Sequence, residues 1–384
     1  MYNKQTKIKL IYYLPCLGTG GTERVVLNLC RYVSRDLFEI EVCSMSDGLL
    51  GDEIRALNIP VRILSNSDNS SRTIAGKICN YSKMLLTLRS LIVSGMPAVF
   101  HTHHYSPLLQ MYFIRKFGMK RFGWLHTEHS KTDVQNSYSN RYYRLVNPMC
   151  GPDIVSGVAD KITLHMREVS GIPANQAVTV LNGIDTTQYL LENREKKRRE
   201  LGFTLDDKII GTIGNLRKEK NQQLVIRAFS HLAKVVSGLH LVICGDGEYR
   251  TELERLANDL GIASRVRFLG YRTDAHEIMT TFDVYCLPSV YEGLPLSILE
   301  AWAAHKPVVA TDVIGISDIV RHEHNGLLVS LNDDRKMADA ILTILRDPDL
   351  AQRLSENGHT LLIEKYDLRQ MVKHYEELYR KIAV

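Results

Sequence analysis

The amino-acid sequence contains no apolar run of the eighteen or so residues that a membrane-spanning helix requires. Its polar, basic N-terminus leads into a short apolar run, residues 8–14, that lacks a small-residue cleavage site. This run therefore predicts a first strand and not the hydrophobic segment of a signal peptide. We accordingly expect a cytoplasmic protein without a leader or a membrane span.

The sequence also lacks any Cys-x-x-Cys pair, and its seven cysteines are odd in number and scattered along the chain. Several of them lie inside apolar, strand-like runs, so we expect reduced core residues. Neither sign of charge dominates, because the net charge at pH 7 is only +5. Such a charge is compatible with phosphate ligands or with an anionic membrane surface, and it is evidence for neither.

A complete Gly-x-Gly-x-x-Gly fingerprint is missing after the first predicted strand, which argues against a dinucleotide-dependent dehydrogenase. The loop in that place, residues 16–24, is nevertheless rich in glycine, and Gly20 and Gly21 allow the backbone to approach a ligand closely. A glycine-rich loop alone is equally compatible with a simple tight turn.

Short apolar runs alternate with helical patterns at short spacing through both halves of the chain. This alternation predicts an α/β protein whose parallel sheets are covered by helices on both faces. A chain of 384 residues is long for a single hydrophobic core, so we expect two domains. Within this pattern, residues 192–201 are predicted to form a charge-rich helix on the surface.

The most informative segment begins with the apolar run 282–287, which predicts a buried strand. Gly293 and Pro295 then break the chain, and Pro295 suits the first turn of the helix that follows. Two carboxylates, Glu292 in the loop and Glu300 in the helix, are separated by seven residues. The unit is therefore a strand, a tight loop and a helix, with an acidic residue on each side of the helix N-terminus.

That helix N-terminus presents free N–H groups and a partial positive charge, which suit a phosphate group. Because carboxylates accept hydrogen bonds from sugar hydroxyls, the pattern favours a nucleotide sugar as ligand. Two solvated glutamates on an ordinary βα unit remain the alternative from these residues alone. A second candidate anion site is the loop 214–221, which carries three cationic residues that include Arg217 and Lys220. The alternative is that this loop is simply a solvated, basic loop.

Two histidine clusters, in residues 98–104 and 122–129, follow predicted strands at the places where crevices of open α/β sheets lie. His101 is expected to point into the core. Zinc is an alternative ligand for such clusters, but no His-Glu-x-x-His spacing is present. The segment Asp347-Pro-Asp349 has the form of a metal-binding pattern, yet it lies between two helical segments, so we interpret it as a loop and expect no metal site.

Residues 73–93 and 112–122 mix basic side chains with apolar or aromatic ones. Such stretches suit the interface of an anionic membrane. The alternative is an amphipathic helix packed on a sheet, which we favour for residues 73–93, whereas both interpretations stay open for residues 112–122.

The segment Glu292-Gly-Leu-Pro-Leu-Ser-Ile-Leu-Glu300 resembles the signature of the retaining GT-B glycosyltransferases of family four. The loop Gly20-Gly21-Thr22-Glu23 and the turn Asn182-Gly-Ile-Asp185 are similar to further motifs of that family. The resemblance extends over nearly the whole chain and is weakest in residues 49–122, where acceptors are chosen.

The resemblance implies two doubly wound, Rossmann-like domains whose parallel sheets face a cleft. An acceptor-binding domain would cover residues 1–184, and a domain that binds the nucleotide sugar would cover residues 185–367. The last helix, in residues 368–384, is expected to pack back on the first domain.

The resemblance also assigns functional residues, with Glu300 on the nucleotide ribose and Glu292 on the donor sugar. The implied catalytic residues are His126, Glu292, Lys220 and Arg217. The implied donor-binding residues are Gly20, Gly21, Asn215, Gly245, Tyr271, Gly293, Leu294, Pro295, Leu296 and Glu300. The implied acceptor-binding residues are Thr22, Glu23, His103 and His129.

Two of these assignments carry an open alternative. His126 matches best the family's histidine that lies against the donor sugar, and His129 is its rival. Lys220 matches the lysine that neutralises the diphosphate. The arginine usual in the family is replaced by Asn215, so Arg217, two residues on, is expected to substitute for it.

The activity implied is that of a retaining, metal-independent hexosyltransferase that uses a nucleoside diphosphate sugar, by family frequency a UDP-sugar, and no cofactor. The acceptor is expected to be a glycan or a polyprenyl-diphosphate-linked glycan in capsule or lipopolysaccharide-type assembly. An anionic membrane surface is a further expected partner, and the protein would then be peripheral at the inner face of the plasma membrane. Nucleic acid is not an expected partner. The alternatives are a sugar phosphorylase or epimerase of the same fold and a non-catalytic protein that binds sugar nucleotides.

Overall fold

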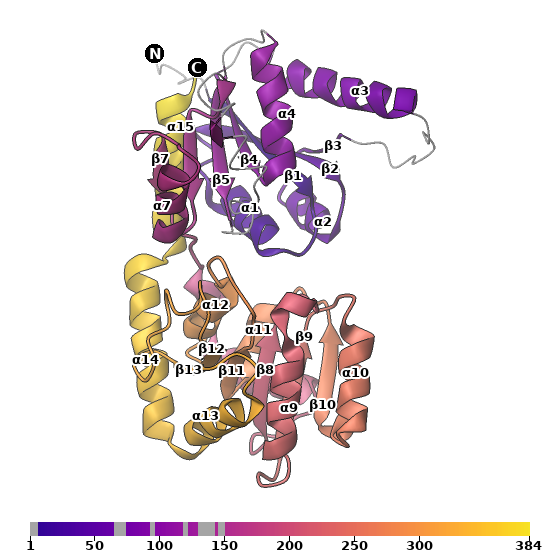
Figure 1. Ribbon diagram of the computed structural model, residues 1–384, viewed down its shortest axis with the longest axis vertical. Coiled ribbons are helices and arrows are strands. Elements are labelled where there is room, and N and C mark those ends of the chain that lie inside the picture. The colour runs from indigo at the N-terminus through magenta and orange to yellow at the C-terminus, as the bar shows by residue number, and fades with distance from the viewer. Residues whose placement is uncertain (1–6, 65–73, 93–96, 118–121, 130–142, 145–149) are drawn as a thin grey trace. The chain divides into compact units, whose positions relative to one another are not determined.

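The computed structural model describes residues 7–64, 74–92, 97–117, 122–129, 143–144 and 150–384 of the chain (Figure 1). The chain forms two compact units. Unit 1 comprises Met1–Asn182 and Leu368–Val384, and unit 2 comprises Gly183–Asp367. The division falls within the Asn182-Gly-Ile-Asp185 turn. The assignment of acceptor and donor to the two units stays a prediction.

Unit 1 is built on a parallel sheet with the strand order β3-β2-β1-β4-β5-β6-β7. Its strands are β1 (Ile8–Cys16), β2 (Phe38–Ser46), β3 (Val61–Ile63), β4 (Ala98–His103), β5 (Gly123–Glu128), β6 (Ile154–Gly157) and β7 (Ala177–Thr179). Its described helices include α1 (Gly21–Tyr32), α2 (Leu49–Ala56), α3 (Ile74–Ile92), α4 (Tyr105–Lys116), α7 (Asp160–Glu168) and α15 (Leu368–Ile382). Central strands such as β4 are buried along their whole length, as expected for a parallel sheet with both faces covered.

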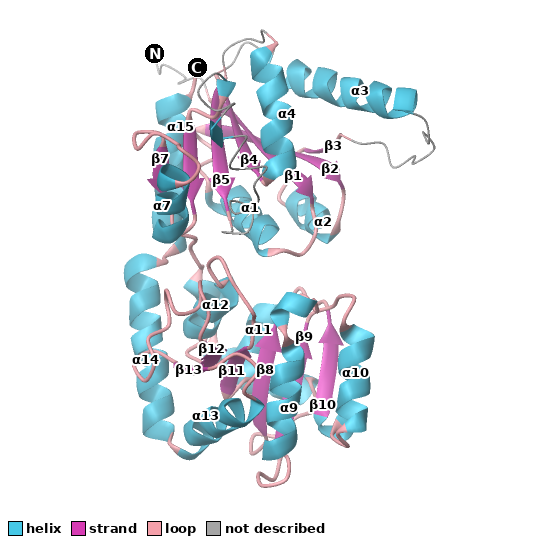
Figure 2. Ribbon diagram, in the orientation of Figure 1, coloured by secondary structure: helices cyan, strands magenta, loops and turns pink. Residues whose placement is uncertain are grey.

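Unit 2 repeats this architecture with the parallel strand order β10-β9-β8-β11-β12-β13 (Figure 2). Its strands are β8 (Lys208–Ile213), β9 (Leu239–Cys244), β10 (Val266–Gly270), β11 (Val284–Leu287), β12 (Val308–Thr311) and β13 (Leu327–Val329). Its helices are α8 (Arg194–Glu200), α9 (Gln222–Leu232), α10 (Arg250–Asp259), α11 (Ala275–Thr281), α12 (Leu296–Ala303), α13 (Asp334–Arg346) and α14 (Pro348–Lys365). The order reverses between β8 and β11, and the predicted doubly wound α/β class is confirmed for both units.

The last helix, α15, packs on the sheet of unit 1 through a buried polar network. The ring of His101 lies between Tyr379 Oη, 2.8 Å from Nδ1, and Thr127 Oγ1, 2.7 Å from Nε2. Tyr375 Oη lies 3.3 Å from the same threonine hydroxyl. His101 is fully buried, as the sequence predicted, and its partners explain how a histidine is accommodated in the core.

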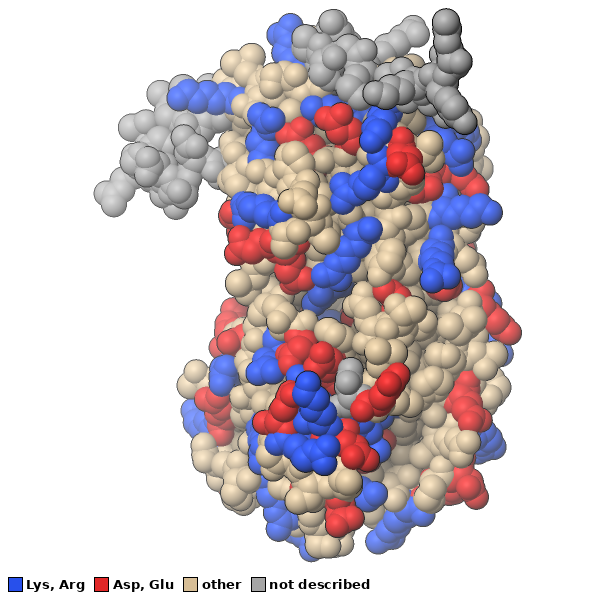
Figure 3. Space-filling model, turned by 180° about the vertical axis from the view of Figure 1, so that it is seen from behind, with Lys and Arg blue, Asp and Glu red and all other residues tan. Residues whose placement is uncertain are grey.

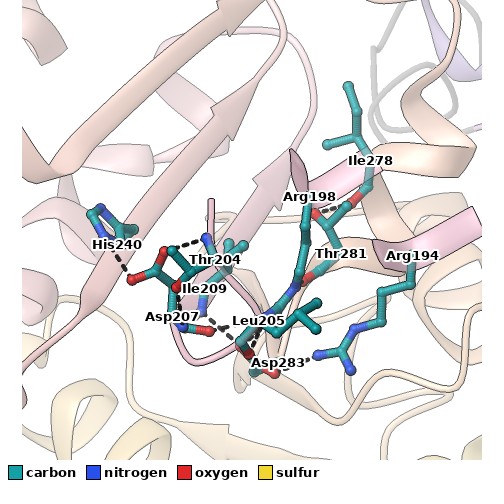
Figure 4. Close-up of polar contacts among 10 residues, drawn as sticks. All are labelled: Arg194, Arg198, Thr204, Leu205, Asp207, Ile209, His240, Ile278, Thr281 and Asp283. Atoms are coloured by element: carbon teal, nitrogen blue, oxygen red, sulfur yellow. Dashed lines mark hydrogen bonds and ion pairs between the residues drawn. The ribbon is translucent and has the colours of Figure 1, made fainter. Parts of the chain in front are cut away.

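The prediction that residues 192–201 form a surface helix is wrong for two of its cations, because Lys197 and Arg198 of α8 are buried. Arg198 is only 2% exposed and its guanidinium group is surrounded by acceptors (Figure 4). It donates to the carbonyl oxygen of Thr281 and, at 2.8 Å, to Asp283 Oδ2. The many charged residues of this segment predicted that its side chains are exposed to solvent. Arg198 is buried because hydrogen-bond acceptors from segments distant in sequence compensate its charge.

Two helix starts differ from the sequence interpretation. Pro295 is the N-cap of α12 and not a residue of its first turn. The segment 347–349 is a loop only at Asp347, which is the N-cap of α14 and whose Oδ1 accepts a hydrogen bond from the backbone N–H of Leu350 at 2.9 Å. Pro348 then occupies the first helical position, where its missing N–H costs nothing.

Within the described ranges, no helix combines the length with the apolar character that crossing a bilayer demands.

Candidate active site

The candidate site of unit 2 lies at the carboxyl ends of β8 and β11, where the strand order reverses. Lys220 follows β8, Glu292 follows β11, and Lys220 Nζ lies 2.6 Å from Glu292 Oε1. The same oxygen accepts a hydrogen bond from Ser289 Oγ at 2.6 Å. Asn221 adds a second link between the loops, because its Nδ2 donates to Pro288 O at 3.2 Å. Ligands of open α/β sheets bind at such a switch point.

The turn after β12 holds the Glu292 loop from the other side. Thr311 Oγ1 donates to Ser289 O at 2.5 Å, and the Glu292 backbone N–H donates to Ile314 O at 3.3 Å. Gly315 has φ +89°, and a Cβ on it would lie 2.1 Å from Glu292 O. Only glycine fits there, because the two backbones touch. Ser289, Thr311 and Gly315 therefore support the site, and the sequence analysis did not single them out.

The helix that follows, α12, begins with its first backbone N–H groups at the site. No described side chain caps this helix, whose N-cap is Pro295 and whose first residue is Leu296. Gly293 is half-buried, while Leu294 and Pro295 are buried against the unit. Of the predicted donor residues in this segment, Gly293 and Leu296 thus keep the most exposed surface, and their contact with a ligand stays a prediction.

Glu300 lies one turn into α12 and is half-buried. Burial raises the pKa of Tyr285, and the charges of Glu300 and Glu292 add to the rise. Both glutamates therefore act on the phenol of Tyr285, the second residue of β11. Tyr285 Oη itself lies 3.4 Å from Ile213 O at the end of β8, so this tyrosine joins the two strands below the site.

Glycines at the ends of β8 and β9 allow the next two loops to meet. Gly245 has φ +138°, and a Cβ on it would lie 2.0 Å from Gly214 O. Gly245 N donates to Gly270 O at the end of β10. Asn215 and Tyr271, both half-buried, follow Gly214 and Gly270 directly. The structure thus brings the predicted donor residues Asn215, Gly245 and Tyr271 to one edge of the sheet.

Arg217 is exposed at the start of the turn that carries Lys220. In the part of the chain that the structure describes, its guanidinium group has neither an ion pair nor a hydrogen-bond partner. This leaves Arg217 available to an anion, and its substitution for the family arginine stays a prediction.

The glycine-rich loop of unit 1 follows β1 and packs on itself. Gly20 is the N-cap of α1, and a Cβ on it would lie 2.3 Å from Glu23 Oε2. Thr22 and Glu23 are buried, and Cys16 Sγ donates to Glu23 Oε1 at 3.4 Å. Only Gly21 of these residues is exposed. The predicted acceptor roles of Thr22 and Glu23 are not tested by these contacts.

His126 lies inside unit 1 with both ring nitrogens bonded. Thr102 Oγ1 lies 2.8 Å from Nδ1, and Glu128 Oε1 lies 3.3 Å from Nε2. Burial would raise the pKa of Glu128, but hydrogen bonds from His126 and Tyr143 outweigh it and hold that pKa below its usual value. His126 has no exposed surface. Its rival His129, beyond the end of β5, is half-buried, and which of the two histidines contacts a ligand stays a prediction.

His103, predicted to line the acceptor, is also fully buried, and its Nδ1 lies 2.8 Å from His129 Nε2. Burial lowers the pKa of both rings well below the ordinary value, and neighbouring histidines add to the effect. No group of three or more potential ligands in the described residues is arranged to hold a metal ion.

The basic, aromatic stretch 112–122 is largely packed against its own unit. Arg115 pairs with Asp153 at 2.7 Å and lies over the ring of Phe122. Lys116 and Phe117 are exposed. On the face drawn in Figure 3, acidic and basic side chains are interspersed. The packed-helix alternative therefore holds for most of this stretch, of which residues 118–121 lie outside the described part.

Comparisons with known proteins agree with this architecture. The family described as Glycosyl transferases group 1 matches residues 193–361, and Glycosyltransferase Family 4 matches residues 19–188. The N-acetyl-alpha-D-glucosaminyl L-malate synthase of Bacillus anthracis is 30% identical over 59% of each chain. The UDP-Gal:alpha-D-GlcNAc-diphosphoundecaprenol alpha-1,3-galactosyltransferase of Escherichia coli is 24% identical over 100% of both chains.

The same fold is present in a solved structure. The crystal structure of Anabaena HepE in complex with UDP and glucose superposes with a TM-score of 0.80 at 21% identity, over 97% of this chain and 99% of HepE. Several curated relatives, in contrast, are matched over only about half to three-fifths of their length. With its two halves matched by the two family descriptions and its fold by HepE, the chain belongs to the family-four, group 1 glycosyltransferases and has the GT-B fold.

Proposed function

We propose that this protein is a retaining hexosyltransferase that transfers a sugar from a nucleoside diphosphate sugar to a glycan or polyprenyl-diphosphate-linked acceptor. The observation that carries the proposal is the 2.6 Å contact between Lys220 and Glu292 beside the N-terminus of α12. A cation, a carboxylate and free backbone N–H groups converge there, which matches the diphosphate and the hydroxyl groups of such a donor.

In this proposal, unit 2 stabilises the leaving group. As the bond between the sugar C1 and the diphosphate oxygen breaks, negative charge grows on the diphosphate. Lys220, Arg217 and the N–H groups of α12 are the local groups that can stabilise this charge. The sugar passes through an oxocarbenium-like state, and the acceptor hydroxyl attacks from the face that the diphosphate leaves, passing its proton to that phosphate. The proposal needs no metal ion, since these protein groups provide the positive charge.

Glu292 is suited to hold the sugar. Only its Oε1 is bonded within the described part of the chain, to Lys220 and Ser289. Its Oε2 is therefore available to a sugar hydroxyl, while the other oxygen keeps the carboxylate in place. Glu300, one turn further along α12, would accept hydrogen bonds from the ribose.

The donor and acceptor classes are supported by the relatives. The E. coli relative is named for UDP-galactose and a diphosphoundecaprenol acceptor, and HepE was crystallised with UDP. We therefore propose a UDP-sugar as donor and a role in cell-surface polysaccharide assembly of the capsule or lipopolysaccharide type. The exposed Lys116 and Phe117 support a peripheral contact with the inner face of the plasma membrane. Flotation with liposomes that contain anionic lipid tests this contact, and its complete absence contradicts it.

A donor screen tests the proposal. Binding of UDP-, GDP- and ADP-sugars is measured by calorimetry, and turnover is followed with a lipid-linked acceptor extract, with and without EDTA. We expect one UDP-sugar to bind and turn over, EDTA to have no effect, and NMR of the product to show the anomeric configuration of the donor.

Matched variants connect the screen to the site. Lys220→Met and Glu300→Gln should weaken donor binding at least tenfold, because each removes a charge-assisted contact. Glu195→Gln on α8, whose side chain is 62% exposed, is the control and should bind like the wild type. Turnover with phosphate and without an acceptor would instead indicate a phosphorylase. Interconversion of the free sugar nucleotide would indicate an epimerase, and binding without any turnover would indicate a non-catalytic protein. Loss of turnover in EDTA contradicts the metal-independent mechanism.

A further inference from the structure

Two histidines of unit 1 form a direct hydrogen bond at the carboxyl ends of neighbouring strands. His103 is the last residue of β4, and His129 follows β5. His103 Nδ1 lies 2.8 Å from His129 Nε2, and the two ring centroids are 5.1 Å apart. His103 has no exposed surface, whereas His129 is half-buried. A fully buried His103 is not placed to touch an acceptor, so its position requires another explanation.

Both rings are neutral at pH 7, because burial and the surrounding histidines oppose a positive charge on either. A hydrogen bond between two neutral imidazoles needs one N–H and one bare nitrogen. The bond therefore allows only two arrangements of protons, and each fixes the tautomer of both rings.

The other nitrogen of His103 decides between these arrangements. His103 Nε2 is buried and has no hydrogen-bond partner in the described part of the chain. If Nε2 carried the proton, a buried N–H donor would be left without an acceptor, which is the rarer and costlier form of an unsatisfied polar group. The proton of His103 therefore belongs on Nδ1, from which it is donated to His129 Nε2. His129 must then carry its own proton on Nδ1.

We propose that His103 is a positioning residue that fixes the ring and the tautomer of His129. His129 then presents an Nδ1–H donor at the carboxyl ends of the strands. Its catalytic consequence rests on the proposed function, since that donor would meet a hydroxyl oxygen of the sugar. His126 differs in this respect, because its two nitrogens are bonded to Thr102 and Glu128 inside the unit.

The tautomer is measured on the full-length protein by proton–nitrogen NMR of ¹⁵N-labelled histidine, with His129 assigned from the signal missing in His129→Asn. We expect His129 to carry its proton on Nδ1 in the wild type. His103→Asn keeps an N–H donor near the place of Nδ1 and should preserve this tautomer. His103→Leu removes the donor and should shift His129 to the Nε2–H form. An Nε2–H form in the wild type, or an unchanged Nδ1–H form in His103→Leu, overturns the proposal.

His101→Asn separates positioning from general damage to the core. The ring of His101 packs on that of His103 with centroids 4.2 Å apart, but its own nitrogens bond Tyr379 and Thr127. This variant should leave the tautomer of His129 unchanged, and an effect as large as that of His103→Leu overturns the assignment.

Turnover provides the second readout. His103→Leu should lower kcat about 10- to 100-fold at a similar KM for the donor, and His103→Asn should restore kcat to within about threefold. Equal losses of kcat in both variants overturn the positioning role. If the wild type itself has no transferase activity, the proposed function fails, while the NMR result still decides whether His103 positions His129.

Discussion

Replacing Arg198 by alanine should destabilise unit 2 by about 3 kcal/mol, at the lower end of the range for removing one partner of a buried ion pair. The estimate follows from what the truncation leaves behind (Figure 4). Asp283 loses the 2.8 Å contact with Arg198, but it keeps Arg194 at 2.7 Å and the backbone N–H of Ile209 at 2.7 Å. The carbonyl oxygen of Thr281 loses both of its guanidinium donors.

The remaining acceptors of Arg198 moderate the cost. Its Nη1 donates to the carbonyl oxygens of Leu205 and Asp207 at 3.2 Å and 3.0 Å. Leu205 is exposed and Asp207 is half-buried, so water can replace part of the lost donor. Arg198→Lys keeps the charge but not the planar set of five donors, so we expect an intermediate loss of stability.

Urea unfolding followed by tryptophan fluorescence measures this loss. Trp302 is fully buried in unit 2, and a Trp124→Phe background removes the signal of unit 1. Arg199→Ala is the matched control, because that side chain is 69% exposed on the same helix, and it should change stability by less than about 0.5 kcal/mol. If Arg198→Ala and Arg199→Ala have the same unfolding midpoint, the buried network does not stabilise the unit and the argument is refuted.

Three further predictions concern buried groups. Gly358→Ala should destabilise unit 2 by about 1–3 kcal/mol, because a Cβ there would lie 2.3 Å from the indole of Trp302; unchanged urea unfolding contradicts this. Burial lowers the pKa of Lys306 to about 7, and the positive charge of Arg194 contributes to this decrease. From pH 7 to about 10 the unfolded chain therefore holds a proton on Lys306 that the folded chain lacks. The free energy of unfolding then increases by about 1.4 kcal/mol for each unit by which the pH rises. Lys306→Met should remove this increase when urea unfolding is measured across the pH range. Tyr379→Phe leaves a buried nitrogen of His101 unpaired and should cost unit 1 about 1–3 kcal/mol, measured by the fluorescence of its own tryptophan; equal stability of variant and wild type would show that the bond contributes nothing.

Local patterns in the sequence predicted most elements because these depend on near neighbours. The apolar run 282–287 contains β11, and Gly293 and Pro295 lie in the loop between this strand and α12. The errors occurred where a distant segment decides the outcome. Arg198 was assigned to the surface because its charged neighbours suggested solvent, and only the packing of α8 against residues 281–283 buries it.

The candidate site was predictable in part. Glu292 and Glu300 stand out by their spacing on a βα unit, and Lys220 stands out in a cationic loop. Their contact does not, because Lys220 and Glu292 are 72 positions apart in sequence. The difference in burial between His126 and His129 also depended on the fold, since both follow the same apolar run in the sequence.

By itself, the sequence determined the alternation of strands and helices, the α/β class with parallel sheets covered on both faces, and the segments that carry charge to strand ends. Hydrophobic periodicity and chain-breaking residues determine these features because they act over a few positions. Only the tertiary structure decided the strand order, the pairing of Lys220 with Glu292 and the hydrogen bond between His103 and His129. These contacts arise when parallel strands place their carboxyl ends side by side, and no interaction between neighbours along the chain encodes that arrangement.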